Sequence, residues 1–407
     1  MTEKFKQLPD LPVDPIMLAN SRWLHFLAEN PDALNTTVGV LVDPISRAPW
    51  QPGTVKYARA VANAAIVEGE KFGYQSQVGH EAFLSQASRM VLGRELQTGA
   101  SHDILGYQAL GGTGALWLAG DVIFEMTHGS ESGRIPMVYD AGWPNHLAIF
   151  KNKFELTDYQ HINPTTGEYD HEAALAAFGE APENSVFLLQ TCGYNDDGMD
   201  RTAEQWDDIL EIAEEKDATV ILDSAYMGLV SGFENERVPI DRCIERGLLT
   251  FVTFSASKNM GVYNERLGAL FVANVTENLG VVQATHFKQL VSRCVRGSVS
   301  NTPLAVAEAA SNVLGDPVYY QELAQARDRL NSNRSSFAEI TRDYLPSAHK
   351  GRGLFAKLLK DGFSDAQVES LNSDGIFVLP NSRINIGGVH ENQVERLGLA
   401  VVRALKI

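Results

Sequence analysis

Short apolar runs alternate with helix-like patterns through most of this chain, from about Trp50 to Asn301. Such alternation predicts a mostly parallel sheet with helices on both faces, an α/β fold. The expected strands are residues 135–139, 186–190, 219–223, 249–254 and 268–273, and the expected helices between them are residues 114–126, 172–178, 203–216 and 239–246. Open α/β sheets bind ligands at the carboxyl ends of their strands, so functional residues are expected directly after these runs.

The flanking segments predict a second, smaller unit. A helix near residues 15–30 and a strand or buried extended segment at residues 36–42 precede the sheet region, and a long helical stretch, interrupted near Asp316, follows it. The C-terminal segment then alternates helix and strand as a separate α+β piece. Because 407 residues are too many for one simple core, we expect three parts. These are an N-terminal arm that joins the small domain (1–48), a large domain (49–310) and a C-terminal small domain (311–407).

Charge and cysteine content exclude several classes of function. The net charge of −17 argues against nucleic acid as a partner. Three widely spaced cysteines without a CxxC pair favour a reducing compartment over a disulfide framework or a metal site. No apolar run reaches membrane-spanning length, and residues 1–15 resemble neither a signal nor a transit peptide. We therefore expect a cytoplasmic protein without a metal, nucleic-acid or membrane partner.

One lysine, Lys258, follows the apolar run at residues 249–254 and has chemically complementary neighbours. Ser255 and Ser257 flank it, and Arg266 lies eight residues further on. Hydroxyls and a guanidinium can hold a phosphate dianion, and a lysine amine can form a Schiff base with an aldehyde. Pyridoxal 5′-phosphate (PLP) carries both groups on one ring, so the segment indicates this cofactor. As a bare Ser-x-Ser-Lys string it is also compatible with a solvated surface lysine.

An aspartate and a tyrosine follow another apolar run, residues 220–222. A carboxylate at a strand tip, here Asp223, can pair with a pyridinium nitrogen and keep it protonated. Tyr226 can form a hydrogen bond with the phenolic oxygen of the same ring. Taken alone, Asp223 is also compatible with an N-cap of the next helix. It precedes Lys258 by 35 residues, about one αβ unit, so the two residues are expected at one edge of the sheet.

A glycine-rich turn, Gly111-Gly112-Thr113-Gly114, opens an apolar helical run. Free N–H groups and the positive end of a helix dipole suit an anion. Gly112 and Thr113 are therefore candidates for phosphate binding, although many ordinary helices begin with a similar turn.

The whole run from Phe254 to Gly268, Phe-Ser-Ala-Ser-Lys-Asn-Met-Gly-Val-Tyr-Asn-Glu-Arg-Leu-Gly, closely resembles the cofactor-lysine segment of the aspartate and aromatic amino acid aminotransferases. These are class I aminotransferases of PLP fold type I. The resemblance extends from Gly39 to Arg383, with the motifs in the family's order. It implies a large domain with a mostly parallel central sheet, a smaller α+β domain, and three catalytic residues: Lys258, Asp223 and Tyr226.

The resemblance adds residues near the cofactor. Trp143 would stack on the pyridine ring, Asn195 would donate to the phenolic oxygen and contact substrate, and His146 would orient Asp223. Two loops depart from the family: residues 195–198 read Asn-Asp-Asp-Gly instead of the usual Asn-Pro-Thr-Gly, and no proline precedes Trp143. The family's proline commonly imposes a cis bond, which costs about 3 kcal/mol without proline. The 195–198 loop is therefore expected either to be trans and reshaped or to retain the strain.

The resemblance also implies how substrate is recognised. A guanidinium is a natural bidentate partner for an α-carboxylate, and Arg383 matches the family's Gly-Arg-Ile-Asn segment, with Gly39 beside the same carboxylate. Arg296 aligns with the residue that binds a distal carboxylate across the subunit interface, and Arg293 competes for that assignment. Tyr74 matches a tyrosine that reaches the phosphate of the neighbouring subunit, which implies a homodimer with shared active sites.

The implied activity is PLP-dependent transamination between an L-amino acid, of aspartate or aromatic type, and a 2-oxo acid such as 2-oxoglutarate. A PLP-dependent lyase, acting by β-elimination or decarboxylation, would use the same residues, and the two altered loops are where such a change would lie. A non-catalytic binding protein of the same fold is the third alternative. It is disfavoured because it would not need to keep Lys258, Asp223, Tyr226 and Arg383 together.

Overall fold

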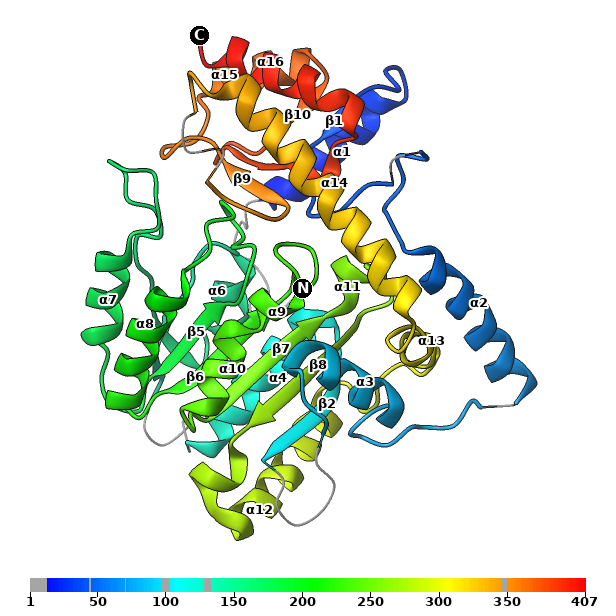
Figure 1. Cartoon of the computed structure of the whole chain (residues 1–407), viewed down its shortest axis with the longest axis vertical. Helices are drawn as coiled ribbons and strands as arrows, with labels where there is room; N and C mark the ends of the chain where they lie inside the picture. Colours follow the sequence, from blue (N-terminus) through cyan, green and yellow to red (C-terminus); the bar gives the residue numbers. More distant parts are fainter. Residues whose placement is uncertain are drawn as a thin grey trace, which may run out of the picture.

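A seven-stranded sheet forms the centre of the computed structural model, which describes residues 13–43, 45–69, 71–96, 103–127, 133–345, 348 and 350–407 (Figure 1). The strand order is β2-β8-β7-β6-β5-β3-β4. The strands are β2 (Ile104–Leu110), β3 (Ile135–Tyr139), β4 (Phe154–Thr157), β5 (Val186–Gln190), β6 (Thr219–Ser224), β7 (Thr250–Ser255) and β8 (Leu267–Ala273). Strand β8 is antiparallel to β2 and β7, and the other neighbours are parallel. This architecture confirms the mostly parallel α/β sheet.

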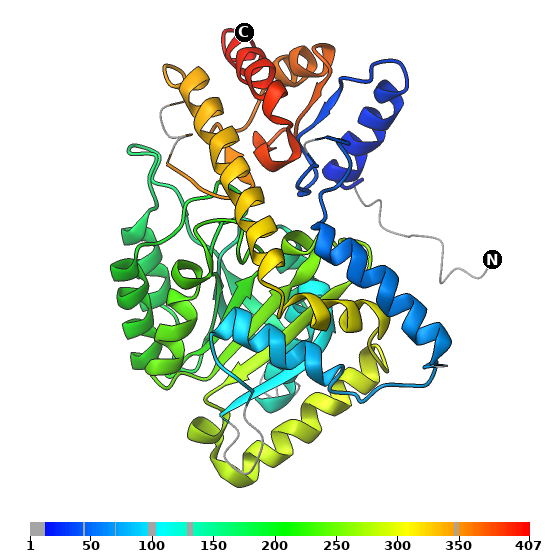
Figure 2. The same cartoon turned by 45° about the vertical axis from the view of Figure 1, so that its right-hand side comes forward.

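Helices cover both faces of this sheet because successive strand residues point to opposite sides. Val220 and Leu222 belong to one hydrophobic core, whereas Ile221 belongs to the other. The core that contains Ile221 includes α4 (Gly111–Met126), α6 (Asn145–Phe150) and α12 (Val275–Ser298). The core on the opposite face includes α2 (Gly53–Glu68), α3 (Glu81–Leu92), α7 (His171–Gly179), α8 (Ala203–Glu215), α10 (Val238–Glu245), α13 (Ala305–Val313) and the first part of α14 (Pro317–Thr341). Figure 2 brings α2, α3 and α13 of that face forward.

Local sequence signals determine where several helices begin. The carboxylate of Asp316 accepts from the amide of Val318, and Pro317 occupies the first turn, where its missing N–H removes no helical hydrogen bond. This cap explains the expected interruption near Asp316, between α13 and α14. In α8, Thr202 and Gln205 form a reciprocal capping box. The short helices α9 (Phe233–Glu236) and α11 (Ala256–Asn259) follow β6 and β7, respectively.

A third hydrophobic core lies at the upper end of the molecule in Figure 1. We define the C-terminal lobe as residues 13–35 and 337–407. It contains α1 (Pro15–Leu27), β1 (Leu34–Asn35), β9 (Phe355–Lys357), α15 (Asp365–Ser373), β10 (Ile376–Phe377), β11 (Arg383–Asn385), α16 (Val394–Ala404) and short 3₁₀ turns at Ile386–Gly388 and Glu391–Gln393. Strand β1 pairs in parallel with β10, and β9 pairs antiparallel with β11. Helix α14 connects the lobe to the sheet: Leu323 lies in the sheet core and Phe337 in the lobe core.

Some elements differ from the expectations. Residues 36–42 form no strand of their own beyond a bridge at Val42. The segment is partly buried but bends at residues 37–38, where the amide of Val40 donates to the carbonyl of Val38 at 2.8 Å, and the amide of Leu41 donates to the hydroxyl of Tyr263 at 3.0 Å. Strands β2 and β4 were not expected. Both lie at the edges of the sheet. Strand β4 has only four residues, and the apolar run of β2 is interrupted by Gly106 and Gln108. Residues 1–12, where the expected N-terminal arm begins, lie outside the described residues. Within the described part of the chain, no helix combines the length and apolarity needed to cross a membrane.

Candidate active site

Polar residues meet at the carboxyl ends of β5, β6 and β7. Gln190 on β5, Asp223 on β6 and Thr253 on β7 are register partners across the parallel ladder. Because parallel strands end at the same edge of a sheet, their terminal side chains converge there. Lys258, on α11 immediately after β7, lines the same pocket as Asp223.

Lys258 occupies an environment that favours its neutral amine. Burial is the main cause that lowers its pKa below the usual lysine value; the positive charge of Arg266 lowers it further, and Asp223 opposes both effects. The Lys258 Nζ lies 5.2 Å from the centre of the Tyr226 ring. A lysine with a lowered pKa is a better nucleophile and proton acceptor near neutral pH, because more of it is unprotonated.

The Asp223 carboxylate is held from two sides. His146, fully buried, lies with Nε2 3.0 Å from Asp223 Oδ2 and with Nδ1 3.1 Å from the carbonyl oxygen of Asp140. The hydroxyl of Thr253 approaches the other oxygen, Oδ1, at 3.5 Å. Asp223 is itself 6% exposed, so its carboxylate is oriented rather than free to rotate. A fixed carboxylate of this kind can hold the protonated nitrogen of a bound pyridine ring.

Asn195 connects two parts of the pocket. Its amide nitrogen donates to the hydroxyl of Tyr226 at 3.3 Å, and its amide oxygen accepts from Arg383 Nη1 at 2.9 Å. Burial raises the pKa of Tyr226, so its phenol stays protonated and can act as a donor. Gln190 fixes the Asn195 backbone, accepting from its N–H at 3.0 Å and donating to its carbonyl at 3.3 Å.

A second group of residues forms an anion cradle. Helix α4 begins at Gly111 without a capping side chain, so its first N–H groups lack that partner. Arg266 lies against this helix start: a Cβ at Gly111, where φ is +70°, would be 2.6 Å from Arg266 Nη2. Arg266 Nη1 also donates to the hydroxyl of Ser257 at 3.2 Å, and Ser255 lies on the same wall. Free N–H groups, two hydroxyls and a guanidinium suit a phosphate dianion.

Arg383 forms the opposite side of the site. It is 4% exposed, its Nη2 donates to the carbonyl of Thr37 at 2.9 Å, and its guanidinium lies 4.5 Å from the centre of the Phe355 ring. Its Nε has no hydrogen-bond partner. A guanidinium has five N–H donors and the bonds to Asn195 and Thr37 use two, so donors remain for a carboxylate. Gly39 lies against the same Phe355 ring.

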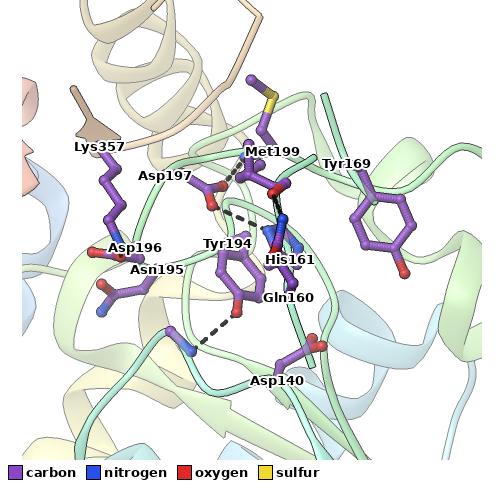
Figure 3. A network of polar contacts seen from close by, with 12 residues as sticks. Asp140, Gln160, His161, Tyr169, Tyr194, Asn195, Asp196, Asp197, Met199 and Lys357 are labelled. Atoms are coloured by element: carbon purple, nitrogen blue, oxygen red, sulfur yellow. Dashed lines mark hydrogen bonds and ion pairs between the residues drawn. The ribbon is translucent and has the colours of Figure 1, made fainter. Parts of the chain in front are cut away.

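The two loops that depart from the family pattern pack on each other. The amide of Gly142 donates to the hydroxyl of Tyr194 at 3.0 Å, the dashed line that ends at Tyr194 in Figure 3. A Cβ at Gly142 would lie 2.0 Å from the Asn195 carbonyl oxygen, so only glycine fits there. All peptide bonds among the described residues are trans. Of the two arrangements expected for the 195–198 loop, a trans bond or a retained cis bond, the structure has the trans bond. Beneath the loops, Asp140 is fully buried and is paired through both oxygens with Arg201, at 2.6 and 3.1 Å.

The structure brings together most of the residues that the sequence singled out. One pocket is lined by Gly112, Thr113, Trp143, Asn195, Asp223, Tyr226, Ser255, Ser257, Lys258 and Arg266. Arg383 joins this group through Asn195. Tyr74 and Arg296 are not part of the pocket lining: Tyr74 is 88% exposed, and Arg296 is exposed with Nη1 2.7 Å from the Ser300 hydroxyl.

Sequence reasoning missed several residues of the site. Gln190 carried a usable signal, since it ends a strand at the same sheet edge. The carbonyl of Thr37 and the ring of Phe355 carried none, because they reach Arg383 only through tertiary packing. The same holds for Lys357, which pairs with Asp196 at 2.8 Å.

Residues 49–400 match the profile of the family described as aminotransferase class I and II. The chain belongs to this family. A curated aspartate aminotransferase of Pseudomonas aeruginosa is 28% identical to it over 414 aligned residues, covering 98% of this chain and 99% of that protein. A mitochondrial aspartate aminotransferase of Dictyostelium discoideum is 30% identical over 408 residues, covering 97% and 92%.

Comparison of folds leads to the same family. The crystal structure of an aromatic-amino-acid aminotransferase from Burkholderia pseudomallei, covalently bound to pyridoxal phosphate, superposes with a TM-score of 0.87 at 25% identity, covering 98% of this chain and 99% of that one. This aminotransferase thus has PLP fold type I and uses PLP as its cofactor. The anion cradle and the buried carboxylate of Asp223 line one pocket, and they suit the phosphate and the ring nitrogen of that cofactor. These relatives are all named aminotransferases, which does not favour the lyase alternative.

Proposed function

We propose that this aminotransferase moves the amino group between an L-amino acid, with an aspartate-like or aromatic side chain, and a 2-oxo acid such as 2-oxoglutarate. The observation that carries the proposal is one pocket lined by Lys258, Asp223 and the Arg266 cradle. Arg383 is linked to this pocket through Asn195. The names of the relatives, aspartate and aromatic-amino-acid aminotransferase, support this choice of substrate class.

When bound, PLP supplies a protonated ring that draws electrons away from the α-carbon of the substrate. The residues of the chain then divide into three tasks. Asp223, oriented by His146, holds the ring nitrogen in its protonated form. Asn195 and Tyr226 donate to the phenolic oxygen, and Trp143 covers the ring. The phosphate is held by Gly112, Thr113, Ser255, Ser257 and Arg266.

Lys258 performs the proton transfer. We infer that its Nζ would attach the cofactor in the resting enzyme and that the same amine, once free, would take the proton from the substrate α-carbon. The lowered pKa of this lysine supports the role, because the neutral amine is the proton acceptor. Arg383, with Gly39, Trp143 and Asn195 nearby, orients the substrate through its α-carboxylate, since the planar guanidinium matches a carboxylate with two parallel hydrogen bonds.

We also propose that the active enzyme is a homodimer with shared sites. Tyr74 and Phe72 are 88% and 72% exposed, an unusual state for neighbouring aromatic side chains, and Tyr57 is 74% exposed. In a dimer, Tyr74 would contact the phosphate in the other subunit, and Arg296 would bind the distal carboxylate of a dicarboxylic substrate there. Measuring the mass of the wild type and of Tyr74→Ala by light scattering, with PLP affinity in parallel, tests this: a monomeric active enzyme would overturn it.

The division into domains and the location in the cell remain proposals of the same kind. We propose an N-terminal arm and part of the small domain (1–48), a large PLP-binding domain (49–310) and a C-terminal small domain (311–407). Separate cores in the sheet region and in the C-terminal lobe support two domains, and α14 spans both of them: its residues up to Leu330 pack in the core of the sheet region, and Phe337 packs in the core of the lobe. A cytoplasmic location is supported by three buried cysteines that form no disulfide.

Absorbance of the PLP-loaded enzyme tests the reaction. L-aspartate, L-glutamate, L-phenylalanine and L-tyrosine are added separately to the purified protein, with D-aspartate as control. Transamination converts the bound cofactor stably to its amine form, releases one 2-oxo acid, and is reversed by 2-oxoglutarate. Release of pyruvate with ammonia, or of carbon dioxide, would instead identify a lyase and would refute the proposal.

A further inference from the structure

Two adjacent residues of the loop after β5 bind two residues that face each other across the β9–β11 ribbon. Arg383 on β11 is the register partner of Lys357 on β9. Asn195 Oδ1 accepts from Arg383 Nη1 at 2.9 Å. Asp196 Oδ2 accepts from Lys357 Nζ at 2.8 Å, and Figure 3 shows these two side chains meeting. Side chains of directly opposed residues emerge on the same face of an antiparallel pair, so both contacts join the loop to the same side of the C-terminal lobe.

The Asp196–Lys357 pair differs from an ordinary surface ion pair. The side chain of Asp196 is 12% exposed and that of Lys357 is 33% exposed. Asp196 Oδ1 is buried without a hydrogen-bond partner, so the Nζ of Lys357 is the main group that compensates this carboxylate. A carboxylate withdrawn from water is costly to leave unpaired, and its field reaches further than that of an exposed charge.

The position of Asp196 matters because it lies beside the guanidinium to which we assign the substrate α-carboxylate. Asp196 and Arg383 interact electrostatically without forming an ion pair of their own. An uncompensated carboxylate there would repel an incoming carboxylate and compete for Arg383. The neighbouring Asp197 has partners of its own: its Oδ2 lies 3.0 Å from Nδ1 of His161, which stacks on the Tyr194 ring, and its Oδ1 accepts from the amide of Met199 at 2.7 Å.

We propose that Lys357 is a positioning residue for carboxylate recognition: by pairing with Asp196 it cancels a buried negative charge beside Arg383 and holds the Asn195–Arg383 contact in the arrangement that binds substrate. The proposal rests on the role of Arg383 given under "Proposed function". Asp196 stands where the family pattern has proline. Its buried negative charge would weaken the binding of a carboxylate at Arg383, and the ion pair with Lys357 offsets this effect.

A cavity of about 420 Å³ borders both members of the pair, together with Gly142 and residues 358–360. Substituted side chains therefore have space on that side, and variants of Lys357 are expected to fold. A matched control exists at Lys350, whose Nζ lies 2.8 Å from Glu168 Oε1. That pair also joins the C-terminal lobe to a loop of the sheet region, but its carboxylate is 63% exposed, against 12% for Asp196, and neither residue contacts Asn195 or Arg383.

The test uses the PLP-loaded enzyme as wild type, Lys357→Met, Lys357→Arg, Asp196→Asn, the double variant Asp196→Asn/Lys357→Met, and Lys350→Met. For each, kcat and KM are measured with an amino acid that the wild type uses. The Kd of succinate is measured by calorimetry, because succinate has carboxylates but neither an amino nor an oxo group and so binds without reacting. Thermal unfolding monitors folding.

Lys357→Met is expected to raise KM and the succinate Kd about tenfold, with kcat changed less than about threefold, since an unpaired charge near the ligand weakens binding. Lys357→Arg and the double variant are expected to stay close to the wild type, because the former keeps the charge and the latter removes both charges. Lys350→Met should bind like the wild type.

Two results would overturn the proposal. Wild-type binding by Lys357→Met would show that the pair has no role. Equal losses in Asp196→Asn, Lys357→Met and the double variant would show a structural contact without charge compensation. Arg383→Lys, measured alongside, separates this inference from its basis: weaker succinate binding in Arg383→Lys with normal binding in Lys357→Met leaves the role of Arg383 intact and removes only that of Lys357.

Discussion

The cofactor side and the carboxylate side of the pocket are built in different ways. Asp223 and Lys258 lie at the ends of neighbouring strands of one sheet, within a short stretch of chain. Arg383, by contrast, is held by Asn195, 188 residues away, and by Thr37, 346 residues away. The first side is as rigid as the sheet that carries it. The second depends on how the C-terminal lobe sits on the sheet, so substitutions there should change substrate affinity more than chemistry.

The largest expected effect is on the cofactor side. Lys258→Ala should lower kcat by about 10⁴-fold or more, because it removes both the attachment point and the proton acceptor. PLP should still bind through the Arg266 cradle, without a covalent link. Turnover is measured by fixed-time assays of product, and non-covalent binding is measured as the loss of PLP from the variant on dialysis. Lys151→Ala, at an exposed position, serves as control; undiminished turnover in Lys258→Ala would remove the basis of the proposed mechanism.

A smaller but still catalytic effect is expected at Asp223. Asp223→Asn preserves the shape of the side chain but no longer keeps the ring nitrogen protonated. We therefore expect kcat to fall about 10²–10³-fold, the loss typical when one electrostatic group is removed from a buried active site, while KM changes little. Steady-state kinetics in both directions provide the measurement. Asp217→Asn is a suitable control because Asp217 is exposed, and its positive φ of 49° is one that asparagine tolerates.

The carboxylate side should show the opposite pattern. Arg383→Lys keeps the charge but loses the planar fork, so KM for the amino acid should rise about tenfold to a hundredfold, with a smaller change in kcat. Arg403→Lys replaces an arginine that is 58% exposed and paired with Asp374, and it should have no effect. If kcat fell as far as in Asp223→Asn while KM stayed constant, the contrast between the two sides would be wrong.

The smallest effect concerns the stability of the folded protein and arises from Asp200, in the loop after β5 that links the two sides. Asp200 accepts from the amide of Tyr194 at 3.2 Å, and burial raises its pKa from 3.8 to about 6. Between these values the folded state binds more protons than the unfolded state, so stability falls as pH rises through the window. Asp200→Asn should thus be more stable than the wild type above about pH 6, by on the order of 1 kcal/mol, with no advantage below about pH 4.

Denaturant unfolding at both pH values measures this difference. Asp328→Asn, at a side chain that is 76% exposed, should show no pH-dependent difference from the wild type. If Asp200→Asn raised the free energy of unfolding equally at pH 4 and pH 7, the pKa of the Asp200 carboxyl would not be raised in the folded protein.

Much of the sheet region could be predicted from the sequence because its signals are local. The expected ranges 135–139 and 186–190 coincide with β3 and β5, since buried parallel strands are continuous apolar runs. The edge strands β2 and β4 gave a weaker signal, because Gly106 and Gln108 interrupt the apolar run of β2 and β4 has only four residues. In the site, the short spacing from Ser255 to Arg266 could be interpreted directly, because one strand and one helical turn hold these residues together.

By itself, the sequence determined the fold class and the reactive groups of this aminotransferase: a lysine after one strand, an aspartate at the tip of the preceding strand, and a phosphate cradle at a helix start. Only the tertiary structure decided what surrounds Arg383. The Asp196–Lys357 pair, the Thr37 carbonyl and the packing of Gly142 on Asn195 join segments far apart in the chain. No local periodicity encodes such contacts, because they arise when the C-terminal lobe and the sheet bury their surfaces against each other.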